Sequence, residues 1–412
     1  MSIDVKMAWR NIWRNTRRTV LTICAIAFAS LLLVFMLSFQ FGSYETMINT
    51  SVKIHTGHLQ IQANGYQEKK NIRWVVSNPA ELATLIDGIP QVESYTFRGQ
   101  AFSLVSSSER TFGVLVTGID PAREAKVSRL KSLMRRGSYL SGDDADQALV
   151  GKILAKNLRV DIGDELTILG QGRDGSIAAT VVTVKGIYST GIDDFDRASI
   201  HIPLNTFQEV YGMQGAVHEI VAIAVALAEV NHVKARLKTA LSSVESERQL
   251  TVLDWNELMP GLRQSIEMDL ISGLIFYLLL ILVVAFSILN TFLMAIFERT
   301  REFGVLMAIG TTPGRLTKVL LIESMTMTLI GIVAGIVIGS LITWYFQSHG
   351  FDMSGASELL SQFGISGRIY PRLTWLSATI GPLAVLVITF LAALYPALKV
   401  RRMHPVEAMR AV

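Results

Sequence analysis

The sequence predicts a membrane α-helical protein with four transmembrane helices plus a large extracytoplasmic α+β domain between helices 1 and 2. A segment that crosses a hydrocarbon layer about 30 Å thick needs roughly 20 apolar residues in a helix. Residues 42–269 are polar and rich in turn signals, whereas about 20 residues rich in Arg and Glu join the second and third apolar stretches. Four stretches are long enough to span: Val20–Phe41, Leu270–Phe297, Val319–Phe346 and Trp375–Leu398.

Composition and charge agree with this class. The chain has 412 residues, of which 50% are hydrophobic, and a mean hydropathy of +0.40. It is too apolar for an ordinary soluble enzyme and too polar for transmembrane helices alone. The net charge of +4 arises beside the spans, where the positive-inside rule places basic residues, so no nucleic-acid partner is expected. The flanking basic residues are Lys6, Arg10, Arg14, Arg17, Arg18, Arg299, Arg301, Arg315, Lys318, Lys399, Arg401, Arg402 and Arg410.

This charge distribution predicts that both termini and the connector between the second and third spans are cytoplasmic, and that the large domain is extracytoplasmic. Residues 1–18 are expected to form a cytoplasmic amphipathic helix, because Trp9, Ile12, Trp13 and Thr16 fall at helical spacing among arginines. Transmembrane helix 1 is expected at 19–42. It lacks the small-residue cleavage site of a signal peptide and is interpreted as an uncleaved anchor.

Residues 43–269 are expected to form the α+β domain, with two lobes. The only cysteine, Cys24, lies in the first span, so this domain must be stable without a disulfide. Alternating apolar and polar residues predict strands, and capping residues before apolar periodicity predict helices. Strands are expected at 58–62, 101–105, 111–117, 165–169, 180–185, 199–202, 219–226 and 250–253, and helices at 79–86 and 233–241.

A stalk helix is predicted at the end of this domain. Apolar residues recur at steps of three and four before the second span, with charged residues off that stripe. The pattern predicts a helix that runs from the domain straight into transmembrane helix 2 at 270–297. The alternative is a packing helix that stops at the membrane interface. The stripe consists of Trp255, Leu258, Leu262, Ile266 and Leu270.

Residues 298–315 are predicted to form a short amphipathic coupling helix. One face is apolar, charged residues cluster at the start, and a glycine ends the helix before Thr312 and Pro313 begin the next one. Because that apolar face needs a partner, we expect it to dock on a cytoplasmic protein; the alternative is a connector that skims the membrane. The residues assigned to coupling are Glu298, Arg299, Arg301, Glu302, Phe303, Gly304, Leu306, Met307, Gly310 and Pro313.

Transmembrane helix 3, at 316–346, contains a glycine stripe. Gly331, Gly335 and Gly339 repeat at four-residue steps, which allows another helix to approach closely. The pattern leaves open whether that helix belongs to the same chain or to a second copy. An extracytoplasmic loop is expected at 347–373, transmembrane helix 4 at 374–398, and a cytoplasmic tail at 399–412.

No catalytic, cofactor or metal site is predicted in this chain. The Gly-x-Gly-x-x-Gly pattern at 170–175 lies between predicted strands and is interpreted as a hairpin tip, and no P-loop motif occurs. Asp193, Asp194 and Asp196 lack calcium-loop spacing and are interpreted as a solvated loop. His55 and His58 lack a third ligand at a recognised spacing and are interpreted as a surface pair.

Four segments carry a resemblance to a known family. They are Ala8-Trp9-Arg10-Asn11, the run from Ala148 to Ala155 followed by Val160 to Asp164, the run from Glu298 to Gly310, and Tyr395-Pro396-Ala397 with His404 to Arg410. The layout and these segments resemble the FtsX-like permease family of ABC transporters, and within it the LolC/LolE-type lipoprotein-releasing permeases and the permease half of MacB. The similarity covers essentially the whole chain.

The resemblance implies a non-catalytic permease subunit of the bacterial inner membrane. It would work as a dimer, with itself or with a second permease, clasped by two copies of a separate cytoplasmic ABC ATPase that binds ATP and Mg. Residues 298–310 would be seated on that ATPase, and the first two spans would act as a lever on the periplasmic domain. The implied activity is extraction or export of lipoproteins or other lipid-like cargo, in contact with membrane lipids.

Two alternatives remain. One is an FtsX-like transmembrane signalling activator of a periplasmic hydrolase; the other is MacB-like tripartite efflux of peptides or drugs, which adds a periplasmic partner. A lipid-accessible cavity between the outer halves of the spans would distinguish a transporter from an activator. Residues 169–178 form a short, glycine-rich loop without proline, unlike the long proline-bearing loop of LolC-like permeases, so recruitment of a periplasmic carrier is not expected.

Overall fold

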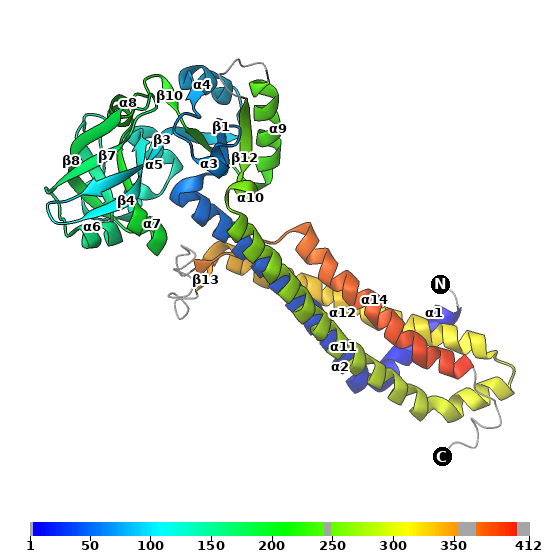
Figure 1. Ribbon diagram of the computed structural model, residues 1–412. Helices are drawn as coiled ribbons and strands as arrows, with labels where there is room; N and C mark the ends of the chain where they lie inside the picture. The colour runs from blue at the N-terminus through cyan, green and yellow to red at the C-terminus, as the bar shows by residue number, and fades with distance from the viewer. Residues whose placement is uncertain (1–2, 243–248, 353–367, 402–412) are drawn as a thin grey trace. The chain divides into compact units, whose positions relative to one another are not determined.

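The computed structural model describes residues 3–242, 249–352 and 368–401, which form two compact units (Figure 1). The helical unit contains residues 3–44, 266–352 and 368–401, and the sheet unit contains residues 45–242 and 249–265. Residues 353–367 of the loop predicted at 347–373, and the tail from 402 onward with its His404 to Arg410 motif, lie outside the described residues.

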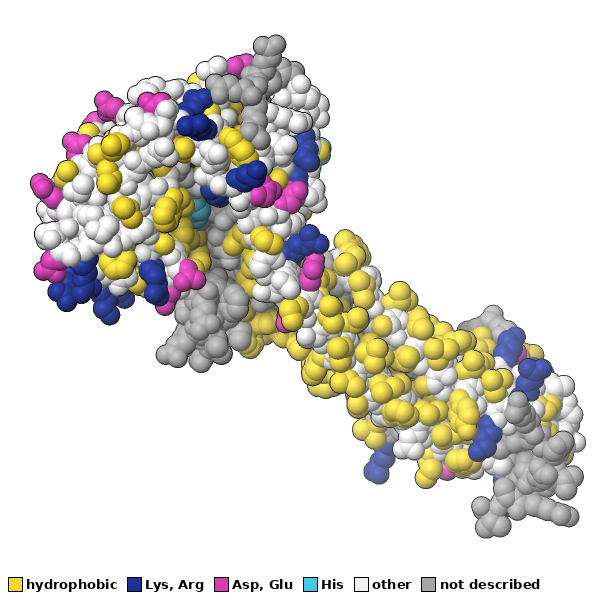
Figure 2. All heavy atoms as spheres, in the orientation of Figure 1, with side chains coloured by type: hydrophobic (Ala, Val, Ile, Leu, Met, Phe, Trp, Pro, Cys, Tyr) yellow, Lys and Arg dark blue, Asp and Glu magenta, His cyan; other side chains and the backbone are white. Residues whose placement is uncertain are grey.

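Four long helices confirm the predicted membrane class. Each is long and apolar enough to cross a membrane. Much of their apolar surface faces outward, as expected for side chains in contact with lipid (Figure 2). The helices are α2 (Thr16–Ser51), α11 (Pro260–Ala308), α12 (Pro313–His349) and α14 (Trp375–Arg401), with α1 (Ile3–Ile12) before them and a short pair of strands, β13 (Phe351–Asp352) and β14 (Arg368–Ile369), between the last two.

The predicted end of the N-terminal helix is wrong, and the first long helix extends beyond the predicted span. The N-terminal helix was expected to reach residue 18, but α1 ends at Ile12 and a 3₁₀ turn, Trp13–Asn15, precedes α2. Ile12 is buried and its carbonyl accepts a hydrogen bond from the Thr19 hydroxyl, a contact that helical periodicity does not encode. Helix α2 continues past residue 42 to Ser51 because residues such as Ile48 are buried within the sheet unit, although the segment is too polar for a span.

The sheet unit is built on one mixed, ten-stranded sheet with the strand order β12-β1-β11-β3-β4-β9-β6-β8-β5 and with β7 paired to β3 and β8. Strands β4 and β9, and β6 and β8, are parallel; the other pairs are antiparallel. The strands are β1 (Leu59–Ala63), β3 (Val92–Ser106), β4 (Thr111–Ile119), β5 (Met134–Gly137), β6 (Gln147–Gly151), β7 (Glu165–Gln171), β8 (Ile177–Tyr188), β9 (Ser199–Pro203), β11 (Glu219–Ala224) and β12 (Leu250–Asp254).

Two hydrophobic clusters divide this sheet. One lies where β1, β11 and β12 pack against helices α4 and α9, and the other where β6, β7, β8 and β9 pack against α6 and α8. The long hairpin of β3 and β4 connects the two halves. The predicted two lobes are therefore two halves of a continuous sheet.

The helices of the sheet unit are short, and a small pair of strands lies outside the main sheet. The helices are α3 (Tyr66–Lys69), α4 (Pro79–Asp87), α5 (Pro121–Val127), α6 (Lys152–Leu158), α7 (Asp193–Ala198), α8 (Leu204–Val210), α9 (Val230–Leu241) and α10 (Trp255–Leu258), and the strands of the small pair are β2 (Val76–Ser77) and β10 (Ala216–Val217).

The strands predicted for this domain and the helices predicted at 79–86 and 233–241 are all present, with longer or shifted ends. Strands β5 and β6 were not predicted. The first is only Met134–Gly137, and its residues are partly or fully exposed, so neither apolar alternation nor a buried run marks it. The second, Gln147–Gly151, is almost entirely buried and reads as a short apolar run that could equally begin a helix.

Candidate functional site

The turn between α11 and α12 is where coupling was predicted, and we call residues 297–315 the coupling segment. A separate helix was predicted at 298–315, but residues 298–308 are the last part of the continuous 49-residue helix α11, and 313–315 already belong to α12. Gly310 adopts φ +102°, a left-handed conformation that favours glycine, and ends the helix. Pro313 begins α12 as predicted, while the Thr312 side chain makes no capping hydrogen bond.

The apolar face of the coupling segment is covered by the chain itself. Phe303 and Met307 are buried, and Leu306 is partly buried, in a cluster with Leu316 and Val400. The expectation that this face lacks a partner within the chain is therefore wrong, because α12 and α14 already occupy it. Docking of the segment on a cytoplasmic protein stays a prediction. Gly304, also assigned to coupling, is buried on the same side.

The acidic residues of the coupling segment pair with arginines near the start of α2. Arg18 contacts Glu298 at 2.5 Å, and Arg14 contacts Glu302 at 2.5 Å. The two glutamates lie four positions apart on α11, and the two arginines are also four positions apart, Arg14 in the 3₁₀ turn and Arg18 in the first turn of α2, so the two pairs form side by side between antiparallel segments. This matched spacing is a signal that sequence reasoning missed, since it read the arginines only as a topology marker.

A different face of the coupling segment remains exposed. Its side chains recur at helical spacing opposite Phe303 and Met307, and Ile309 at the turn is 74% exposed. The exposed stripe, which we call the outer coupling face, consists of Phe297, Arg301, Val305, Ala308 and Ile309. An exposed stripe of large apolar residues beside an arginine is a typical protein-docking surface.

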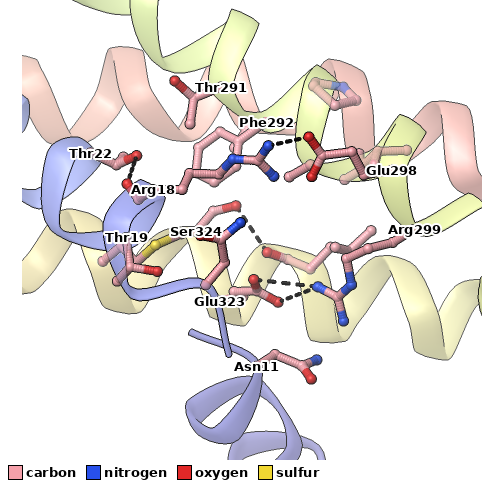
Figure 3. Close-up of a pocket in the computed structure, with 18 of the residues that line it drawn as sticks. Asn11, Arg18, Thr19, Thr22, Thr291, Phe292, Glu298, Arg299, Glu323 and Ser324 are labelled. Atoms are coloured by element: carbon pink, nitrogen blue, oxygen red, sulfur yellow. Dashed lines mark hydrogen bonds and ion pairs between the residues drawn. The ribbon is translucent and has the colours of Figure 1, made fainter. Parts of the chain in front are cut away.

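A cavity of about 230 Å³ lies beside these ion pairs, between the ends of the four long helices (Figure 3). Within it Arg299 lies 3.3 Å from Glu323, and these two side chains are only 15% and 13% exposed. Glu323 therefore faces protein, as an acidic side chain on a membrane helix must to avoid lipid. Arg14, Arg18 and Arg299, which line the cavity, each pair with a glutamate, so these charges hold helices together, and the described residues around the cavity offer no free arginine to a ligand.

A second, apolar groove lies in the half of the helical unit remote from the coupling segment. It has a volume of about 720 Å³ and an almost wholly apolar wall from α2, α11 and α14. Such a wall offers dispersion contacts and no hydrogen bonds apart from the Tyr277 hydroxyl, so it suits hydrocarbon chains. The residues that line it are Leu33, Leu37, Leu274, Tyr277, Leu278, Ile281, Leu282, Ile380, Gly381, Leu383, Ala384, Val387 and Ile388.

The glycine stripe of α12 packs against α2 of the same chain. A Cβ atom added at Gly335 would lie 2.5 Å from the Ala27 carbonyl oxygen, and one at Gly331 would lie 2.8 Å from Ile26. At Gly339 the nearest atoms, in Leu31, would be 3.2 Å away. Absent side chains thus let the two backbones touch, which settles the open choice in favour of an intramolecular partner.

The predicted stalk helix is interrupted. Trp255 and Leu258 lie in the short helix α10, Met259 has φ −126° and ψ 65°, and α11 begins at Pro260. A residue before proline is disfavoured in the α conformation, and proline has no N–H to continue the ladder. From Pro260 the helix is continuous past Ile266, so only the second part of the predicted stalk holds; Leu262 is partly buried and Ile266 is buried.

The remaining sequence candidates have structural roles. The pattern at 170–175 is the tip of the β7–β8 hairpin, as predicted. The acidic group was expected to be a solvated loop, but it forms helix α7, and buried Asp196 accepts hydrogen bonds from Thr190 and Ser189. The surface pair is also wrong, because His58 is buried and His55 is half-buried. Among the described residues no group of three metal-ligating side chains converges.

The Arg14–Glu302 ion pair gives a first testable prediction. Glu302→Arg places a third cation beside Arg14 and Arg299. It should lower the free energy of unfolding by only about 1 kcal/mol, because the Arg14 and Glu302 side chains are both half-exposed. Arg14→Glu combined with Glu302→Arg should recover part of that loss, as measured by thermal unfolding of the purified full-length chain. Strictly additive losses in the double variant would contradict the pairing.

Two protein-family models match the chain. The MacB-like periplasmic core domain matches residues 19–240, more than half of the sequence, and the FtsX-like permease C-terminal model matches residues 274–405. The first matched region contains nearly all of the first long helix and most of the sheet unit. The second contains most of the other three long helices and the coupling segment.

Individual relatives agree with these matches. The lipoprotein-releasing system transmembrane protein LolC of Xylella fastidiosa (strain 9a5c) is 25% identical over 314 residues, which cover 73% of this chain and 74% of the relative. LolC of Neisseria meningitidis serogroup B (strain ATCC BAA-335 / MC58) is 23% identical over 406 residues, 95% of this chain and 94% of the relative.

Among solved structures, the periplasmic region of MacB from Actinobacillus actinomycetemcomitans superposes with a TM-score of 0.36 and 15% identity, covering 52% of this chain and 94% of that one. The two family matches together account for both structural units and for all four long helices. The chain therefore belongs to the FtsX-like permease family of ABC transporters, with a MacB-like periplasmic core domain and LolC/LolE-type relatives.

Proposed function

We propose that this permease couples ATP hydrolysis in a separate ATPase subunit to movement of its periplasmic domain, and that its cargo is a lipoprotein or another lipid-like molecule. The apolar groove between α2, α11 and α14 carries the cargo proposal. It is large enough for acyl chains and lies on helices that continue toward the sheet unit at Ser51 and from Pro260. Relatives named as lipoprotein-releasing support the same cargo class.

The groove favours transport over the alternative of a signalling activator, since an activator of a hydrolase needs no site for hydrocarbon. Tripartite efflux is less favoured because the groove wall is almost entirely apolar, whereas peptides require hydrogen-bond partners. Efflux remains the second candidate, supported by the match to a MacB-like periplasmic core domain.

The proposal includes an orientation and a set of partners. The coupling segment and both termini lie in the cytoplasm of a bacterium, and the sheet unit lies in the periplasm, in accord with the basic residues beside α1, α12 and α14. Two copies of a cytoplasmic ATPase bind ATP and Mg, and this non-catalytic chain pairs with a second permease subunit. Hydrolysis changes the ATPase shape, and α2 and α11 carry that displacement across the membrane.

The outer coupling face is proposed as the ATPase contact. Glu298 and Glu302 are held by arginines of the same chain, so the exposed apolar residues Val305 and Ile309 are better placed to meet a partner. Arg301 adds a charge at the edge of this surface. Large apolar side chains at an interface centre commonly carry most of the binding energy.

Charge substitutions on this face test the proposal. Val305→Asp or Ile309→Asp should weaken association with the ATPase by at least about 10-fold, because a buried unpaired carboxylate costs more than 1.4 kcal/mol. The matched control is Leu398→Asp on α14, an exposed apolar residue at the same end of the helical unit but outside the coupling segment. The tagged permease is purified from native membranes, and bound ATPase is measured by ATP hydrolysis.

The control should retain the ATPase. Equal retention by all three variants would place the ATPase contact elsewhere. Absence of any ATP-hydrolysing subunit from the wild-type preparation would contradict the coupling function itself.

A further inference from the structure

The outer end of α2 is capped by the sheet unit. The helix ends in one π-helical turn, Val52–Thr56, followed by Gly57, and we call residues 52–57 the helix-end joint. A helix leaves its last carbonyl groups without partners inside the helix. Here the Lys53 carbonyl accepts from the Arg129 backbone N–H at 2.7 Å, and the Thr56 carbonyl accepts from the Gln60 side chain at 2.8 Å. The His55 carbonyl accepts from Arg98.

Arg98 is the unusual member of this set. Its side chain is 1% exposed, and it donates two hydrogen bonds to the Glu124 carboxylate, at 3.0 and 2.6 Å. Glu124, on α5, is equally buried. Burial alone would raise the pKa of the Glu124 carboxyl, but the charge and hydrogen bonds of Arg98 outweigh it and lower that pKa below its usual value. The pair therefore stays ionised inside the domain.

Stability alone does not explain a buried ion pair, because an apolar pair of similar volume often serves as well. The geometry offers a better reason. A guanidinium is a rigid planar fork, so two bonds to Glu124 fix the direction of the remaining N–H groups of Arg98. One of those groups points at the His55 carbonyl, where a positive charge also complements the helix dipole.

Arg98 also lies at a central position of the sheet. It is on β3, opposite Glu219 of β11 on one side and Ile119 of β4 on the other. Strand β3 joins the two halves of the sheet, so a force on Arg98 is distributed to both. Two residues further on, Gln100 contacts the His55 ring at 3.1 Å and donates to Glu219 at 3.0 Å, which adds a second tie to the same turn.

We propose that Arg98 is a positioning residue for mechanical transmission: braced by Glu124, it ties the outer end of α2 to the centre of the sheet so that both move as one body. This inference rests on the proposed function, in which α2 carries displacement from the ATPase. Without the tie, the joint keeps its connection to β1, which starts at Leu59 on one side of the sheet order, and the single hydrogen bonds from Arg129 and Gln100, neither of which has the braced fork of Arg98. Movement of the helix end would then be absorbed by bending at the joint.

The test removes both charges together, so that no unpaired ion remains. Arg98→Met with Glu124→Leu is compared with Lys185→Met with Asp144→Leu, which removes another largely buried ion pair of the sheet unit, remote in the hydrogen-bond network from the joint. Spin labels at Met47 on α2 and Glu93 on β3 report their separation in the full-length, Cys24→Ser permease in complex with its ATPase. Distances are measured with and without ATP.

In the wild type and in the control pair, the label distance should keep one narrow distribution in both states. In the Arg98/Glu124 variant the distribution of label distances should broaden and become dependent on ATP. The ATP-driven movement of the sheet unit per ATP hydrolysed should also fall at least about fivefold, which is the lower end of the factors by which coupled sites usually affect each other. Arg98→Lys should give an intermediate value, because lysine keeps the charge but not the fork.

A distribution in the Arg98/Glu124 variant that stays narrow, with undiminished movement, would overturn this inference. A wild-type complex that shows no ATP-dependent movement of the sheet unit would instead contradict the proposed function on which the inference rests. A variant that fails to fold is recognised by loss of hydrogen-exchange protection across the sheet, and Arg98→Lys then decides, since an undiminished Arg98→Lys response would also overturn the assignment.

Discussion

Replacing Gly335 with alanine is expected to destabilise the helical unit strongly, although the change adds a single methyl group. The added Cβ atom would lie 2.5 Å from the Ala27 carbonyl oxygen and 2.6 Å from Ser30 Cβ, distances at which atoms cannot remain. The neighbour at closest contact is backbone, which cannot rotate away as a side chain can. Helices α2 and α12 must separate, and overpacking of this kind costs about 1–3 kcal/mol or more.

The same helix supplies a matched control. Gly314, in the first turn of α12, has no atom within 4 Å of an added Cβ atom. Gly314→Ala should therefore stabilise the chain by about 0.5–1 kcal/mol, because alanine loses less backbone entropy than glycine in a helix. The measurement is thermal unfolding of the full-length permease in detergent without its ATPase.

The three glycines of the stripe should follow the order of their contacts. Gly331→Ala should cost less than Gly335→Ala, because its two closest neighbours are Ile26 side-chain atoms at 2.8 Å, and Gly339→Ala should cost least, with nothing nearer than 3.2 Å. An alanine at Gly335 that leaves stability unchanged, or that acts like the one at Gly314, would show that α2 and α12 do not pack closely in the membrane.

Acidification is expected to unfold the sheet unit between about pH 6.5 and 4. Three buried histidines, His58, His201 and His218, have their pKa lowered to about 4, in each case chiefly by burial. The unfolded chain takes up protons on these rings below its ordinary pKa, while the folded chain does not. Stability is therefore complete above pH 6.5 and decreases as the pH falls toward 4.

The size of this effect is large because the three groups act in the same direction. Each histidine lowers the free energy of unfolding by up to about 3 kcal/mol at pH 4, whereas the total free energy of unfolding of a domain is typically about 5–15 kcal/mol. Glu124 adds to the loss at lower pH, since its lowered pKa makes its ionised form part of the folded state. Hydrogen exchange in the strands β1 and β11, corrected for the intrinsic pH dependence of exchange, localises the opening to this unit.

His201 is the best single probe because its Nδ1 atom is buried without a hydrogen-bond partner among the described residues. In His201→Leu the number of protons taken up on unfolding should fall by about one, so the free energy of unfolding should decrease less steeply as the pH is lowered. An equal decline in the wild type and His201→Leu would remove His201 from the acid response.

Local features of the chain could be predicted from sequence wherever they depend on neighbours in sequence. Gly310 and Pro313 mark the turn between two helices because their backbone preferences are intrinsic, and the glycines at 170–175 mark a hairpin tip for the same reason. The break before Pro260 had an equally local cause, yet the apolar stripe from Trp255 to Ile266 hid it. A periodic pattern reports which face is apolar, not whether the backbone is continuous.

Partners were harder to predict. The face of Phe303 and Met307 looked vacant in the sequence because the residues that cover it, Leu316 and Val400, lie on other helices. The arginines at 14 and 18 carried a clear topology signal that concealed their role as partners of Glu302 and Glu298. Arg98 gave no signal at all, since a lone arginine in a strand is usually exposed.

Sequence by itself determined the class of this protein, four membrane helices with a large domain inserted in the chain between the first two, because span length, hydropathy and flanking charge follow from the solvent that each segment must face. Only the tertiary structure decided that the glycine stripe meets α2, that the coupling segment turns Val305 and Ile309 outward, and that Arg98 reaches the end of α2. Those contacts join residues far apart in the chain. Their existence depends on how the helices and strands are placed, which no local pattern specifies.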